Sequence, residues 1–219
     1  MSGFDKSVFL QPKRDLIWKI LLAFFGDMLM GFGIALNFCA GFGSDPISVF
    51  ADGLHNFFHI DLGMAFNVAN YTLFAIILIF ARRYINIGTL IHTLPLGLFV
   101  SVGVHLYTLL SPPSNVIFRS AVALLACVLL LFGNAIFIAV NIGLDPWTGL
   151  AMLLRDKTSF EYKVYRVVID VTALVLGFLL GGTVGVTTAV AAIFGGPIIQ
   201  AFANFIKKSI LNKFNFKNN

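Results

Sequence analysis

The hydrophobic residues of this chain fall into six long segments, which are separated by short polar stretches rich in glycine and proline. A helix needs about 20 apolar residues to cross the hydrocarbon core of a bilayer. The pattern therefore predicts an all-α transmembrane bundle with six spans. We place the spans at residues 17 to 41, 62 to 81, 87 to 110, 116 to 141, 162 to 181 and 183 to 206.

The composition agrees with a protein that lies in the lipid bilayer. Of the 219 residues, 58% are hydrophobic and 11% are charged, whereas soluble domains carry about 25% charged residues. We expect one membrane domain over residues 1–219. The net charge of +5 does not indicate a nucleic-acid partner, because the basic residues flank apolar segments instead of forming one patch.

The positions of lysine and arginine predict the orientation of the chain. Apart from Arg119 just inside the fourth span and Arg166 in the fifth, these residues lie before or at the start of the first span, after the second, between the fourth and fifth, and in the tail at 207–219. The loops that fall on the other side, at 42 to 61, 111 to 115 and 181 to 183, contain neither residue type. Because positively charged loops stay in the cytoplasm, we expect both termini to be cytoplasmic.

One short motif occurs twice, 100 residues apart, as Gly43-Ser-Asp45-Pro46 and as Gly143-Leu-Asp145-Pro146. Residues 33–54 and 133–154 align without a gap and share seven identities. Glycine and Asp-Pro seldom coincide by chance in so apolar a chain, so the pattern indicates an internal duplication. The copies are residues 17–110 and 116–206.

Each copy contains three spans, and an odd number inserts the second copy upside down relative to the first. We therefore expect Asp45-Pro46 at the outer face and Asp145-Pro146 at the cytoplasmic face. Inverted-topology repeats form the architecture of many secondary transporters. Channels and accessory membrane proteins can be built in the same way, so the transport reading is an analogy at the level of the fold.

The chemistry of the motif predicts a helix that starts directly after each aspartate. Aspartate is a strong N-cap and proline is favoured at the first helical position. The motif thus predicts short helices at 46–58 and 146–156, either interfacial or re-entrant. In one reading the aspartates only cap surface helices. In the other, the helices dip inward and aim their positive ends at a substrate.

The wider pattern resembles the YczE/YyaS/YitT-type integral membrane proteins of bacteria, and is closest to the YczE branch. The similarity is carried by Gly31, Gly33, Ala35, Ala40-Gly41-Phe-Gly43-Ser-Asp45-Pro46, Gly53-Leu54, Gly63, Asn67 and Ile87-Gly88-Thr89. It implies a small multi-pass protein of the bacterial plasma membrane. It supplies no catalytic or binding residues.

Four ionisable residues lie inside the predicted spans, where charge is costly and usually functional. Asp27, His92, Arg166 and Asp170 all fall toward the cytoplasmic end of their spans. The two acids can carry a proton or cation, with Arg166 as counter-charge and His92 as a relay. Alternatively, Arg166 and Asp170 form a static pair, since they are four residues apart on one helix, and His92 is a satisfied interior residue.

These features predict a small secondary transporter that moves a small polar or amphipathic solute by alternating access. We expect the solute to contact Asn37, Asp45, Ser48, Asn67, Asn70, Asp145, Trp147 and Thr148. The alternatives are a substrate-capturing subunit of an ATPase-driven importer and a non-transporting accessory protein. Stripes of small residues fit contacts within one bundle or between subunits of a homo-oligomer. We expect no enzyme, cofactor or metal site, because no nucleophile with a base, zinc spacing or phosphate loop occurs.

Overall fold

The computed structural model describes residues 12–211, and regular secondary structure in that range is helical. The elements are α1 (Lys13–Ala40), α2 (Pro46–Phe58), α3 (Leu62–Phe80), the 3-10 helix η2 (Arg82–Tyr84), α4 (Ile87–Thr93), α5 (Leu96–Leu110), α6 (Val116–Val140), α7 (Pro146–Lys157), α8 (Tyr162–Leu179), α9 (Val186–Ile206) and the π-helical turn η3 (Lys207–Leu211). Residues 1–11, with Lys6, and the tail residues 212–219, with Lys213 and Lys217, lie outside the described range.

Five helical stretches in this part of the chain are long and apolar enough to cross a membrane. They are Lys13–Ala40, Leu62–Phe80, Ile87–Leu110, Val116–Val140 and Val186–Ser209. The fifth predicted span, at 162 to 181, corresponds to α8, which has 18 residues but carries Lys163, Arg166 and Asp170. The chain is therefore an all-helical multi-pass protein, and its α8 helix is less apolar than its five candidate spans.

Both predicted short helices begin where the motif places them. Asp45 caps α2 by accepting a hydrogen bond from the Ser48 N–H, and Asp145 caps α7 by accepting one from the Thr148 N–H at 2.9 Å. The preceding helices end at Gly41 and Asn141, which both adopt positive φ. The chain thus leaves each helix two residues before the motif glycine, Gly43 or Gly143.

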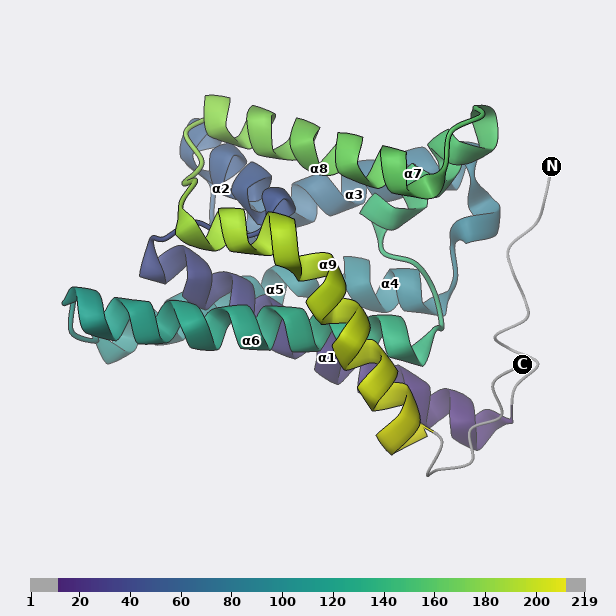
Figure 1. The fold of residues 1–219 in the computed structure, drawn as a ribbon, viewed down its shortest axis with the longest axis horizontal. Coiled ribbons are helices and arrows are strands. Elements are labelled where there is room, and N and C mark those ends of the chain that lie inside the picture. Colours follow the sequence, from purple (N-terminus) through teal and green to yellow (C-terminus); the bar gives the residue numbers. More distant parts are fainter. Residues whose placement is uncertain (1–11, 212–219) are drawn as a thin grey trace.

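The helices form two packed layers (Figure 1). One layer contains α1, α5 and α6, and the other contains α2, α3, α7 and α8. The layers are joined by α3 packing on α5, while α9 crosses over α6 and diverges from α8. Within the second layer α2 packs on α8, and α3 packs on α7.

Glycines allow the closest helix contacts. A Cβ atom on Gly26 of α1 would lie 2.8 Å from the carbonyl oxygen of Gly133 in α6. Between α2 and α8, a Cβ atom on Gly53 would lie 2.4 Å from the carbonyl oxygen of Gly177. Membrane helices lack a strong hydrophobic drive to associate, so backbone approach at small residues supplies much of the packing energy.

A matched pair of substitutions tests this packing. Gly177→Ala places a methyl group 2.5 Å from the carbonyl oxygen of Val49, so we expect a loss of about 1–3 kcal/mol and a Tm lower by several degrees. Gly196→Ala in α9 meets no atom within 4 Å and should keep or raise the Tm, because alanine favours helix. Thermal unfolding of the detergent-purified variants measures both. Equal effects of the two substitutions would contradict the packing argument.

Candidate functional site

The two Asp-Pro turns border one cavity of about 60 Å³. Asp45 and Asp145 line it together, so α2 and α7 both begin at this cavity. The prediction that the turns lie at opposite faces is wrong. Residues 41–45 and 141–145 are non-helical and lead from the ends of α1 and α6 back into the interior, where Pro46 and Pro146 are buried. Of the two readings of the motif, the geometry favours helices that enter the protein.

The cavity brings together six of the residues predicted as site candidates. Its wall includes Asp45, Ser48, Asn70, His92, Asp145 and Trp147. It also includes Asn134, which the sequence reasoning missed. The sequence feature that could have identified Asn134 is an amide side chain within a strongly apolar span. Phe66 and Phe137 complete the wall with aromatic surface, and a phenylalanine in so apolar a chain gives no such signal.

Three other candidates lie away from this wall. Asn37 is buried beside a smaller cavity of about 20 Å³, and its Oδ1 accepts a hydrogen bond from the Cys127 thiol at 3.7 Å. Thr148 receives a hydrogen bond from Arg166 at 3.4 Å. Asn67 contacts Gly97 and its Oδ1 has no hydrogen-bond partner within residues 12–211.

The indole of Trp147 fixes the amide of Asn70. Its Nε1–H donates to Asn70 Oδ1 at 3.0 Å, and both residues are buried. Trp147 is therefore an interior residue. The bond leaves Asn70 Nδ2 buried and without a partner among residues 12–211. A buried donor of this kind is costly unless a water or solute accepts its hydrogen bond.

The four ionisable residues predicted inside the spans form two pairs. His92 Nδ1 lies 2.8 Å from Asp27 Oδ1, and Asp27 is fully buried. Arg166 Nε donates to Asp170 Oδ2 at 3.2 Å, one helical turn further along α8. Asp145 links the pairs, because its charge interacts with both His92 and Arg166. The four groups thus meet in one electrostatic cluster around the capping aspartate of α7.

A cluster of polar side chains holds the far end of α7. Asp156 accepts hydrogen bonds from Arg83 and Tyr84 of η2, and from Arg155 at 3.0 Å. Burial opposes the charge on Asp156, but these donors outweigh it and lower the pKa of Asp156 to about 2. The end of α7 is therefore tied to the turn after α3.

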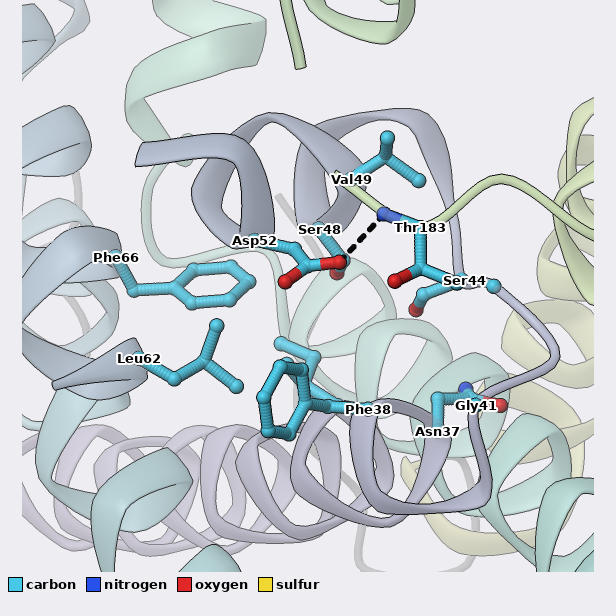
Figure 2. A pocket seen from close by; sticks show the side chains of 12 residues that line it. Asn37, Phe38, Gly41, Ser44, Ser48, Val49, Asp52, Leu62, Phe66 and Thr183 are labelled. Atoms are coloured by element: carbon cyan, nitrogen blue, oxygen red, sulfur yellow. Dashed lines mark hydrogen bonds between the residues drawn. The ribbon is translucent and has the colours of Figure 1, made fainter. Parts of the chain in front are cut away.

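The C-terminal part of α2 is also held by side-chain hydrogen bonds, but here they bind backbone groups and include no arginine. Asp52 accepts a hydrogen bond from the Thr183 N–H at 2.6 Å (Figure 2). Asn56 donates to the Gly181 carbonyl at 2.8 Å. Asn56 and Asp156 are 100 residues apart, so corresponding positions tie each short helix to the turn after a helix of the other copy.

The cluster at Asp156 gives a prediction on stability against pH. Asp156→Asn should lower the Tm at pH 7 by a few degrees, since a partly exposed charge network contributes about 1 kcal/mol. The folded-state pKa lies below the ordinary value of 3.8, so the stabilisation is complete above about pH 5 and is lost as the pH falls toward 2. The Tm difference from wild type should shrink below about pH 4. Glu161→Gln is the control, and a difference that grows on acidification would refute the assignment.

Comparison with known proteins agrees with an all-helical, multi-pass membrane protein. Residues 17–204 match a family of unknown function, DUF6198. An uncharacterized protein of Haemophilus influenzae is 27% identical over 191 residues, which cover 86% of this chain and 85% of that protein. The uncharacterized membrane protein YczE of Bacillus subtilis is 24% identical over 189 residues, 86% of each chain. No solved structure gives a significant match.

The chain belongs to the DUF6198 family, because the family match extends over most of its length. The similarity to YczE confirms the resemblance drawn from the Gly-x-Asp-Pro pattern and its surroundings. Neither comparison assigns a function, so the site has to be interpreted from its own geometry.

Proposed function

We propose that this chain is a small secondary transporter that moves a small polar or amphipathic solute by alternating access. The cavity bordered by both Asp-Pro turns carries the proposal. Two helix N-termini, each with a partial positive charge, meet there with an acidic cap on each. Discontinuous helices of this kind form the binding sites of many transporters, where non-helical backbone is tolerated because it lines a cavity.

In this proposal six helical segments span the membrane as two inverted repeats. Reciprocal backbone hydrogen bonds support the symmetry. The Gly88 N–H donates to the Ile142 carbonyl at 3.1 Å, and the Thr187 N–H donates to the Phe42 carbonyl at 3.2 Å. Each bond joins the start of the last span of one copy to the Asp-Pro loop of the other. Such an exchange of equivalent contacts is expected of two units related by a two-fold axis.

The small cavity fits a conformation that is closed on both sides. About 10–15 Å³ holds one water, and sites for organic molecules measure about 300–1,000 Å³, so 60 Å³ accommodates a few waters. The ties at Asp52 and Asp156 act as the outer and cytoplasmic gates. We assign the Asp156 tie to the cytoplasm because it contains Arg83 and Arg155, and both termini then lie on that side.

The buried acids supply ion coupling. Asp27 and Asp170 are each paired with a base, and protonation of either acid would weaken its pair with His92 or Arg166. Through Asp145 such a change reaches the N-terminus of α7. Retaining ionisable groups at this depth costs stability, which supports a function for them beyond holding helices together.

Proteoliposomes containing a pH-sensitive dye test the proposal. External solutes of differing charge, namely alkylammonium ions, amino acids and polyols, are added in turn, and we expect at least one to drive proton movement. Asp27→Asn and Asp170→Asn should each slow this flux at least tenfold, whereas Asp15→Asn at the start of α1 should not. Equal flux in all variants would exclude the coupling role.

Absence of flux with every solute would exclude an autonomous transporter. Transport that appears only with a co-purified ATPase would instead identify the chain as a substrate-capturing subunit.

A further inference from the structure

The α8 and α9 helices diverge from each other (Figure 1). A second cavity, of about 320 Å³, is lined by residues of both helices. Its size lies within the range of small-molecule sites. Asp45, Arg166 and Asp170 line it together with Val171, Leu174 and Ile193. The apolar rim is the more open part, since Val171 is 53% and Ile193 is 65% exposed, whereas the side chain of Asp170 is 30% exposed. Charged groups thus lie deeper than apolar ones.

The same place in the first copy is closed, and the sequence explains the difference. A Cβ atom on Gly97 of α5 would lie 2.3 Å from the carbonyl oxygen of Gly63 in α3. The N-caps of α4 and α9, Asn86 and Gly185, are 99 residues apart, and this offset aligns Gly97 with Gly196. A Cβ atom on Gly196 would meet nothing within 4 Å. Lys163 occupies the position of Gly63. The α8 helix therefore lacks the glycine that lets α3 approach the backbone of α5, and α8 and α9 border a cavity at this place instead.

One carboxylate oxygen at the cavity lacks a partner in the described part of the chain. Asp170 uses Oδ2 to bind Arg166, while its Oδ1 is buried and has no hydrogen-bond partner there. An unpartnered carboxylate oxygen next to ligand-sized space indicates that something from outside the protein completes its hydrogen bonding.

The charges lining the cavity select a cation. Two carboxylates face one guanidinium there, and Arg166 also interacts with Asp145, so the cavity has an excess of negative charge. In surroundings of low dielectric constant this excess attracts a positive group strongly. Valine, leucine and isoleucine walls suit an alkyl or aryl body.

We propose that the α8–α9 cavity binds amphipathic organic cations, with the positive centre beside Asp45 and Asp170 and the apolar body against Val171 and Ile193. The exposed rim lets such a molecule arrive from the bilayer. This assignment names a substrate class and rests on the proposed transport function only for the step that follows binding.

Tetraphenylphosphonium tests the site, with tetraphenylborate as a probe of the same shape and opposite charge. Binding of radiolabelled probe to the purified full chain in nanodiscs is measured against empty nanodiscs. We expect saturable binding of the phosphonium at one site per chain and none of the borate. Asp170→Asn should weaken it at least tenfold, and so should Asp45→Asn, which keeps an N-cap and therefore the α2 helix.

Two tryptophan substitutions distinguish a filled cavity from a general effect on folding. Val171→Trp fills the cavity and should abolish binding. Val168→Trp adds the same side chain at an exposed position of α8 outside the cavity and should not. Binding of both probes alike, or binding unchanged by Asp170→Asn and Val171→Trp, would overturn the proposal. Saturable phosphonium binding without flux of any solute would establish the site and exclude the transport function.

Discussion

Backbone groups inside a membrane protein must find hydrogen bonds within the protein, and this constraint shapes the centre of the structure. The non-helical loops before α2 and α7 cannot satisfy themselves. Their carbonyls at Phe42 and Ile142 are satisfied by N–H groups at the starts of α9 and α4, and the Thr188 hydroxyl accepts the hydrogen bond of the Ser44 N–H. The lack of a side chain at Gly88 makes this close contact between backbones possible, since a Cβ atom on Gly88 would lie 2.8 Å from the Ile142 carbonyl carbon. Each copy thus depends on the other for the satisfaction of its loop.

The same solution brings charge into the interior. Aspartate is the side chain that caps the two inward-facing helix ends, so two carboxylates enter with the loops. Asp145 is offset by Arg166 and His92, which in turn bind Asp170 and Asp27. Helix capping, a structural need, therefore places an ionisable network beside a cavity. Transport is one use of that network. It is supported by the meeting of two helix N-termini and their capping aspartates around the same cavity, and by the two ion pairs that interact with Asp145.

The sequence predicted the local parts of this arrangement well. Hydropathy located the helices to within a few residues, and Asp-Pro located the starts of α2 and α7, because periodicity and capping are properties of neighbouring residues. The placement of the two turns at opposite faces was wrong, since a turn motif does not reveal whether the chain runs along a surface or back into the bundle. The contacts of Trp147 with Asn70 and of His92 with Asp27 join residues 77 and 65 positions apart. These contacts depend on how each helix is rotated about its axis. Apolar residues lie nearly uniformly around each helix, so their pattern does not specify that rotation.

Aligned positions of the two halves differ in charge in both directions. Gly63, Asn70 and Asn56 align with Lys163, Asp170 and Asp156, whereas Asp27, Asp52 and Arg83 align with Cys127, Met152 and Thr183. In the first half, close backbone contact seals α3 against α5, whereas in the second half Arg166 and Asp170 line a cavity between α8 and α9. Equivalent movements of the two halves would therefore meet different resistance, because opening the first separates close-packed backbone, whereas α8 and α9 already border a cavity. The two halves are thus asymmetric here even though the contacts at the Asp-Pro loops are reciprocal.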